Sequence, residues 1–158
     1  MTSDHVVPGE PLPSGQHHHP AQKIRTPEGR YAWIDTGMVA LVRALWAAGY
    51  VTVTCCQDLG ESAGELSPRA AACWKGYALL ELPVTDACAL ATLAAAHDLT
   101  RHWAEPGAWE VSAPVIMLGS RAVLMNLVQV HFPAGQIHGL TRLVARYGRQ
   151  FLEGQRRR

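Results

Sequence analysis

Two adjacent cysteines, Cys55 and Cys56, are the side chains of this chain best suited to nucleophilic or metal chemistry. They end a run in which valine and threonine alternate, which predicts a strand over residues 51–56 with successive side chains on opposite faces. We expect Cys55 to lie in the core with Val51 and Val53, because free cysteine is among the most buried residue types. Cys56 then faces away from the core beside a polar loop, and it is the candidate reactive thiol.

A histidine and a glutamate at two later strand ends are the candidate partners of Cys56. His131 and Glu81 occupy equivalent positions, 50 residues apart, in two similar stretches of sequence. Alternation along both strands places them on the face of Cys56. An imidazole can accept a thiol proton, and a carboxylate can orient the imidazole. Cys56, His131 and Glu81 are therefore the predicted catalytic group.

A zinc site is a second chemistry that these residues allow. Cys56 and His131, with one acid of the following loop, would leave one coordination position for water. The loop acids are Asp58, Glu61 and Glu65. The sequence lacks the cysteine and histidine spacings of common zinc motifs, so it assigns no metal ligand and no cofactor. The run His17 to His19 lies in a proline-rich stretch without apolar periodicity, and we expect it to be structurally inert.

Polar residues of the same strands and of the loop after Cys56 are the candidate ligand-binding residues. They are Thr52, Thr54, Gln57, Asp58, Tyr77 and Gln129. Nucleic acid is a weaker candidate partner. Arg142, Arg146 and Arg149 recur at helical spacing, and such a stripe can contact phosphates. We favour the alternative that this stripe is a solvated helix face.

The elements that must position these residues follow the order helix, strand, strand. Asp35 or Thr36 is the expected N-cap of a first helix that Gly49 ends. Strands are expected over 51–56, 76–82, 109–118 and 122–132, and further helices over 83–98 and 133–147. Residues 57–75 are expected to form a long polar loop. Pro114 favours an edge position or a bulge for its strand.

Two stretches of the chain resemble each other. Leu82-Pro83 and Phe132-Pro133 each end a predicted strand and open a helix with leucines at matching positions, which indicates an internal repeat. Two helix–strand–strand units and a C-terminal helix predict a permuted ferredoxin-like α+β sandwich. Its four-stranded, mainly antiparallel sheet would carry helices on one face and leave the other face open.

Length and composition fit one domain. The chain has 158 residues, of which 48% are hydrophobic and 17% charged. We expect a disordered tail over 1–29, one domain over 30–148 and a basic tail over 149–158. The net charge of +1 gives no global attraction to nucleic acid or membranes, and no apolar run is long enough to span a bilayer. Four cysteines without an export signal indicate reduced thiols in the cytoplasm.

From Asp35 to Gln57 the chain resembles small bacterial and phage domains of unknown function. In these domains a leucine-rich helix, a glycine turn and a threonine-bearing strand end in Ser-Cys-Gln or Ser-Cys-Glu. The resemblance extends more loosely over residues 31–147, Cys55 replaces the usual serine, and no activity comes with it. A fainter similarity concerns the wybutosine-synthesis methyltransferase family. Its motif continues Ser-Gly-Arg where this chain has Gln57-Asp58-Leu59, so that function is not carried over.

Two functional hypotheses follow from the sequence. The first is a non-catalytic regulatory module, possible as a homodimer, that binds a small ligand, a protein or a nucleic-acid strand on an open sheet face or an exposed strand edge. The second is a thiol-dependent or metal-assisted enzyme centred on Cys56 and His131. The first is favoured at this stage, because no complete catalytic constellation and no nucleotide-binding motif can be identified in the sequence.

Overall fold

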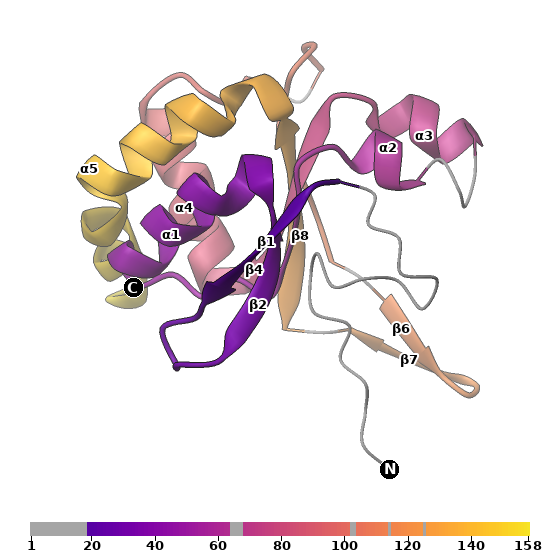
Figure 1. The fold of residues 1–158 in the computed structure, drawn as a ribbon, viewed down its shortest axis with the longest axis horizontal. Helices are drawn as coiled ribbons and strands as arrows, with labels where there is room; N and C mark the ends of the chain where they lie inside the picture. Colours follow the sequence, from indigo (N-terminus) through magenta and orange to yellow (C-terminus); the bar gives the residue numbers. More distant parts are fainter. Residues whose placement is uncertain (1–18, 64–67, 102–103, 114, 125) are drawn as a thin grey trace.

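The computed structural model describes residues 19–63, 68–101, 104–113, 115–124 and 126–158, and a four-stranded antiparallel sheet lies at its centre (Figure 1). Across the sheet the strands are β3 (Thr54–Cys56), β4 (Tyr77–Pro83), β8 (Leu127–Pro133) and β5 (Glu110–Ser112). One face carries the helices α1 (Val39–Ala48), α4 (Val84–Ala96) and α5 (Ile137–Arg156). The 3-10 turns η1 (Thr36–Met38) and η2 (Ala134–Gln136) lead into α1 and α5.

The strand order confirms the predicted permuted ferredoxin-like α+β sandwich. β4, α4 and β5 form a split β-α-β unit, because β8 lies between β4 and β5 and runs antiparallel to both. β4 leads into α4 and β8 leads into α5 through the prolines Pro83 and Pro133, each an N-cap residue. β3 follows α1 and completes the sheet at the edge beside β4.

The core lies between the sheet and the three helices. Leu80 and Val130 of the central strands are fully buried, as are Leu45 of α1 and Leu140 of α5. Cys55 joins this cluster and is only 6% exposed, as the alternation predicts. Each buried leucine stabilises the fold by roughly 1.5–3 kcal/mol relative to an exposed one. Because Cys55 is packed in this core, the next residue of β3, Cys56, faces the other side of the sheet.

The strand before the two cysteines is shorter than predicted. Only Thr54 to Cys56 pair with β4, whereas Val51 and Val53 are 48% and 42% exposed and do not join the core. The Val51 N–H donates to Asp86 Oδ2 at 2.8 Å, so a side chain takes the place of a ladder partner there. The predicted faces are thus correct for the cysteines and wrong for the valines.

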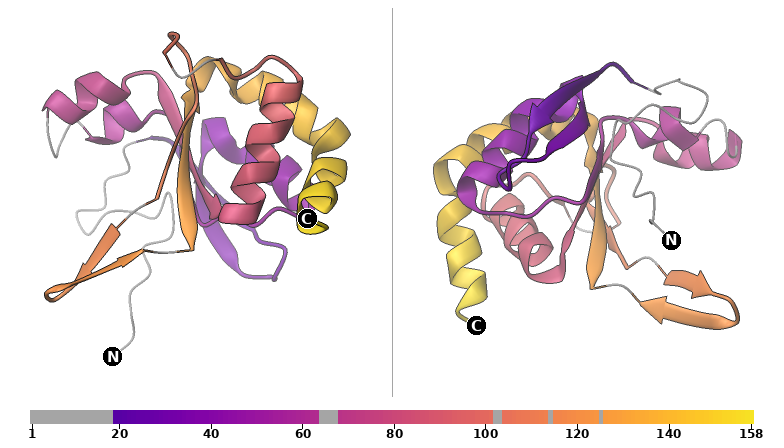
Figure 2. Two further views of the ribbon diagram at one scale, coloured as in Figure 1. Left: turned by 180° about the vertical axis from the view of Figure 1, so that it is seen from behind. Right: turned by 60° about the horizontal axis from the view of Figure 1, so that its bottom comes forward.

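Part of the predicted N-terminal tail is folded, which corrects the boundary at residue 29. β1 (Ala21–Arg25) and β2 (Tyr31–Asp35) form an antiparallel hairpin (Figure 2). Ile24 and Ile34 are 5% and 3% exposed and belong to the core. β1 contributes one large apolar side chain, so the sequence pattern was too weak to identify the strand. Residues 1–18 lie outside the described residues.

The C-terminal helix is longer than predicted. α5 continues to Arg156, although the sequence pattern places its end near Tyr147 and a basic tail over 149–158. Leu152 is 1% exposed, and Arg156 Nη2 lies 3.3 Å from Asp86 Oδ1. The last turns therefore belong to the domain. The sequence pattern did not indicate this, because the one buried leucine stands among many basic residues.

The two strands predicted over 109–118 and 122–132 are each divided. Their inner halves are β5 and β8 of the central sheet. The outer halves, β6 (Val115–Leu118) and β7 (Arg121–Leu124), form a separate hairpin that projects away from the sheet (Figure 2). β5 is an edge strand, and Pro114 lies outside the described residues.

The second face of the sheet is partly covered, which corrects the predicted open face. The expected loop over 57–75 contains α2 (Leu59–Ala63) and α3 (Pro68–Trp74), which lie on the other side of the sheet from α1, α4 and α5 (Figures 1 and 2). On this covered part Cys56, Leu79 and His131 are 8%, 6% and 3% exposed. Within the described part of the chain, no helix is long and apolar enough to cross a bilayer.

Candidate metal centre

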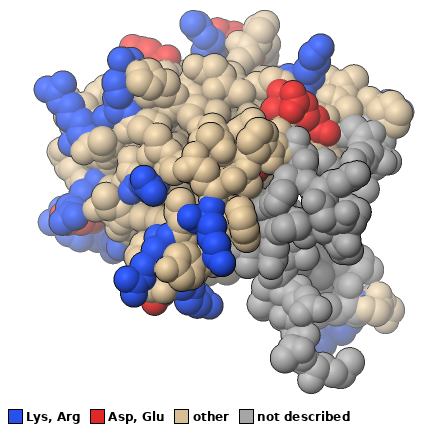
Figure 3. Space-filling view, viewed as in Figure 1, with Lys and Arg blue, Asp and Glu red and all other residues tan. Residues whose placement is uncertain are grey.

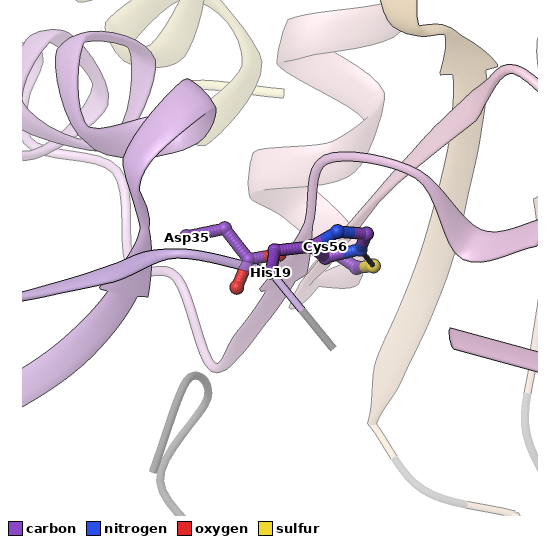
Figure 4. A group of neighbouring side chains, drawn as sticks. All are labelled: His19, Asp35 and Cys56. Atoms are coloured by element: carbon purple, nitrogen blue, oxygen red, sulfur yellow. Dashed lines mark hydrogen bonds between the residues drawn. The ribbon is translucent and has the colours of Figure 1, made fainter. Parts of the chain in front are cut away.

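Three buried side chains from distant parts of the chain converge next to β3 (Figure 4). They are His19, which precedes β1, Asp35 at the end of β2, and Cys56 at the end of β3. One imidazole nitrogen, one carboxylate oxygen and the sulfur all lie within 4.8 Å of one another. Nitrogen, oxygen and sulfur donors in this combination are typical ligands of zinc.

Asp35 is held in place by the residue that follows Cys56. Its Oδ2 accepts a hydrogen bond from the Gln57 N–H at 3.0 Å, and the Gln57 side chain accepts one from the Gly37 N–H at 2.8 Å. A Cβ at Gly37 would lie 2.6 Å from Gln57 Oε1, so a larger residue there would push the Gln57 side chain out of this position. Asp35, one of the two predicted N-cap residues, is the N-cap of η1 but makes no side-chain capping bond to it. Its carboxylate lies beside His19 and Cys56 instead.

His19 faces hydrogen-bond acceptors with both ring nitrogens. Nδ1 lies 3.1 Å from Glu61 Oε2, and Nε2 lies 3.1 Å from the Asp58 carbonyl oxygen and 3.5 Å from Cys56 Sγ. A neutral imidazole carries one N–H and can donate to only one of the two oxygens. The Ser62 hydroxyl lies 3.3 Å from Nε2 and can donate to it, so while Nδ1 donates to Glu61 the Nε2 lone pair can accept a hydrogen bond or bind a metal ion.

The Cys56 thiol is not activated by its surroundings. The pKa of Cys56 is raised to about 11, mainly by burial and also by the Asp35 carboxylate, although hydrogen bonding to Ser62 acts in the opposite direction. A reactive thiolate normally needs a positive neighbour. Among the described residues, no lysine or arginine forms an ion pair with Asp35 or Glu61. A bound cation would supply the missing positive charge.

The start of α2 is fixed by an aspartate. Asp58 Oδ1 accepts hydrogen bonds from the N–H groups of Gly60 (2.9 Å), Glu61 (3.3 Å) and Gly76 (3.3 Å). Gly76 directly precedes β4, so this carboxylate ties the two ends of the α2–α3 segment together. A Cβ at Gly60 would lie 2.5 Å from the Lys75 Cα, and the segment closes only with glycine there. The closure holds Glu61 against His19.

The predicted catalytic group is not assembled. Cys56 is paired with Leu79 and Leu79 with His131, so one strand separates the thiol from the histidine and their Cα atoms are about 10 Å apart. Glu81 lies in the next row of the sheet, opposite Thr54. Alternation identified the face correctly but does not give lateral distance across a sheet.

His131 has surroundings of its own. Its ring stacks on Trp74 of α3 with centroids 4.2 Å apart, and Trp74 meets Tyr77 edge-on at 6.1 Å. His131 Nδ1 is buried and has no hydrogen-bond partner among the residues that the structure describes. Burial lowers the pKa of His131, and the neighbouring Glu110 opposes this effect. The imidazole is thus a packed, neutral ring.

The predicted ligand-binding residues separate into three groups. Gln57 and Asp58 lie at the site, where they position Asp35 and α2. Thr52 accepts a hydrogen bond from the Trp46 indole at 2.8 Å and lies outside the strand. The remaining residues are half-buried on the strands of the partly covered face, and they are Thr54, Tyr77 and Gln129.

The arginines of the predicted nucleic-acid stripe are all exposed on α5. Arg149 donates to the Ala47 carbonyl at 2.9 Å, and the Arg146 guanidinium lies 5.0 Å from the Tyr147 ring centroid. Arg142 is exposed. Lysine and arginine side chains on this side of the molecule occur in separate groups (Figure 3). Two of the three arginines of this stripe therefore make contacts within the protein.

Comparison with protein-family models, with curated proteins and with solved structures finds no match for this chain. The resemblance of residues 35–57 to small bacterial and phage domains stays a prediction. Function must therefore be inferred from the geometry of the centre formed by His19, Asp35 and Cys56.

Sequence analysis missed two of the three converging side chains. His19 stands in the proline-rich stretch that is expected to be inert, and Asp35 has a sufficient local explanation as a helix N-cap. The available signals were the aspartate at the start of the helix that leads to the cysteines and the histidine run upstream. Neither signal indicates that the two side chains meet Cys56.

Proposed function

We propose that this chain binds a zinc ion through His19, Asp35 and Cys56 and functions as a metal-assisted enzyme. The observation that carries the proposal is the environment of His19 Nε2. This nitrogen lies 3.5 Å from a thiol sulfur and 3.1 Å from a carbonyl oxygen, with the Asp35 carboxylate close by. A divalent cation bound to this nitrogen, the sulfur and the carboxylate satisfies these three donors at once.

The distance between the sulfur and the nitrogen fits tetrahedral zinc. With Zn–S near 2.3 Å and Zn–N near 2.05 Å, a tetrahedral angle places sulfur and nitrogen about 3.6 Å apart. The separation of Cys56 Sγ and His19 Nε2 is 3.5 Å. One thiolate, one carboxylate and one neutral imidazole also balance the charge of Zn²⁺. Three protein ligands with a fourth exchangeable position are the arrangement of catalytic zinc sites.

The surrounding hydrogen bonds support the same proposal. Histidine ligands of zinc commonly donate their second N–H to a carboxylate, which fixes the tautomer and the ring orientation. Glu61 Oε2 accepts from His19 Nδ1 at 3.1 Å in this way. The Gln57 N–H orients the Asp35 carboxylate. Both contacts prepare the donor atoms for a metal ion.

A thiol nucleophile is the competing function. Cys56, His19 and Glu61 follow the order of a thiol–imidazole–carboxylate triad. The Asp35 carboxylate beside the thiol and the raised pKa of Cys56 oppose thiolate formation in the absence of a cation. The Asp35 carboxylate would thus bind the metal ion in a zinc centre, whereas in a triad it would hinder formation of the thiolate.

A zinc competition titration tests the proposal. We expect one zinc ion per chain, and His19→Ala, Asp35→Asn or Cys56→Ser should each weaken binding more than about 100-fold. Matched controls replace exposed residues of the same types, namely Cys73→Ser, His138→Ala and Asp98→Asn. Circular dichroism checks that each variant is folded. Zinc affinity that is equal in the wild type and in Cys56→Ser would overturn the proposal.

A further inference from the structure

A serine of α2 lies where a fourth zinc ligand would stand. Ser62 Oγ is 3.1 Å from Cys56 Sγ and 3.3 Å from His19 Nε2. In tetrahedral zinc, an oxygen ligand lies about 3.5 Å from the sulfur and about 3.3 Å from the nitrogen. The Ser62 hydroxyl therefore lies at distances from the sulfur and the nitrogen that are close to those of a further zinc ligand.

We propose that the Ser62 hydroxyl occupies the fourth coordination position of the resting centre, and that a small oxygen- or nitrogen-donor ligand binds by displacing it. This inference rests on the proposed zinc site. Ligand exchange changes only coordinate bonds, because Ser62 leaves with its proton and the incoming donor supplies a lone pair. The centre is then closed at rest and opens when α2 moves.

The chemistry of the donors supports displacement of this one ligand. A thiolate, an imidazole and a carboxylate are strong zinc ligands, whereas a neutral hydroxyl is not among the usual ones. Ser62 is therefore the ligand that exchanges most readily. His19 and Cys56 are only 4% and 8% exposed, and Glu61 and Ser62 of α2 contact the His19 ring, so a shift of α2 would open a path to the ion.

The position of α2 couples the exchange to the rest of the centre. Glu61 and Ser62 are adjacent on α2, and they contact opposite nitrogens of His19. A shift of α2 that frees the fourth position also loosens the carboxylate that orients the histidine. Asp58 joins this helix to the start of β4, so α2 and α3 should move together.

Cobalt substitution with azide as the probe tests the inference. Co²⁺ bound to Cys56 should give a sulfur-to-cobalt charge-transfer band, and azide binding should change the visible spectrum. Ser62→Ala should bind azide about tenfold more tightly than the wild type, because no hydroxyl has to be displaced. Ser62→Cys should add a second sulfur band and block azide. Ser112→Ala, at an exposed serine of β5, is the control and should match the wild type.

The outcomes separate this inference from the proposed function. Absence of any sulfur-to-cobalt band would overturn the zinc site itself. A sulfur band in the wild type, together with equal azide affinity in the wild type and Ser62→Ala, would overturn only the role of Ser62. A Ser62→Cys variant that binds Co²⁺ without a second sulfur band would do the same, because the introduced thiol would then lie outside the coordination shell.

Discussion

Replacement of Asp35 by asparagine should change two properties of Cys56 in opposite senses. The amide keeps the shape of the side chain, and its oxygen can still accept the Gln57 N–H. The negative charge next to the thiol is lost. In the metal-free protein the thiol should become easier to ionise, whereas zinc should bind more weakly because an anionic ligand is missing. A thiol nucleophile without metal would show only the first change.

The magnitude follows from the separation of the charges. The donor atoms of Asp35 and Cys56 lie within 4.8 Å, where two unit charges repel by about 0.9 kcal/mol in water and about 3.5 kcal/mol at an effective dielectric constant near 20. The smaller value corresponds to an increase in the thiolate fraction of at least about fourfold. Iodoacetamide alkylation of the metal-free protein, followed by mass spectrometry, measures this increase at Cys56.

The effect on zinc affinity is measured with the same variant, Asp35→Asn. Loss of one of three protein ligands should lower zinc affinity by more than about 100-fold, since even changes around the ligands cost 10- to 100-fold. Asp98→Asn is the control and should change neither quantity, because Asp98 is exposed and far along the chain from the centre. Unchanged alkylation together with unchanged zinc affinity in Asp35→Asn would refute the placement of Asp35 beside Cys56.

Three further predictions concern pH, packing and His131. Zinc binds the thiolate, and burial raises the pKa of Cys56 to about 11, so the apparent zinc association constant should rise about tenfold per pH unit between about pH 7.5 and 9 in a competition titration. The stability of the metal-free protein should instead fall as the pH rises. The contribution of this thiol to stability is present below about pH 9 and is lost toward pH 11. Both effects should disappear in Cys56→Ser. Gly60→Ala forces a Cβ to within 2.5 Å of backbone and should loosen the α2–α3 segment, seen as faster amide exchange there, whereas Gly154→Ala, with nothing within 4 Å, should not. His131→Phe keeps the ring stacking and removes a buried Nδ1 that has no partner among the described residues, but it also removes the hydrogen bond of the ring to the Glu110 backbone, so the free energy of urea unfolding should change by less than about 1 kcal/mol. A clearly larger loss would show that Nδ1 also makes a stabilising contact.

The fold could be predicted because its signals are local and repeated. Alternating residues, proline at the starts of helices and a glycine after α1 identify elements without knowledge of distant contacts. Gly49 adopts the left-handed conformation, with φ of 94°, that ends the helix as predicted. The N-terminal hairpin was not predicted because its two strands pair with each other and contribute few apolar side chains to the core.

The candidate site could be predicted only at Cys56. Strand alternation places this thiol at a strand end and on the face away from the main helices. It gave the wrong partner, because a sheet face extends in two dimensions and Leu79 separates Cys56 from His131. The true neighbour, His19, lies 37 residues upstream in a stretch without periodic pattern. Contacts of this kind depend on how the hairpin docks, which no local pattern encodes.

X-ray absorption at the zinc edge of the zinc-loaded protein tests the central claim most directly. A centre formed by His19, Asp35 and Cys56 predicts one sulfur at about 2.3 Å and nitrogen or oxygen ligands at about 2.0–2.1 Å, with the sulfur lost in Cys56→Ser. Cys73→Ser should leave the spectrum unchanged, because that thiol is exposed and is not one of the three converging donors. A shell of nitrogen and oxygen alone in the wild-type protein would contradict the proposed zinc centre.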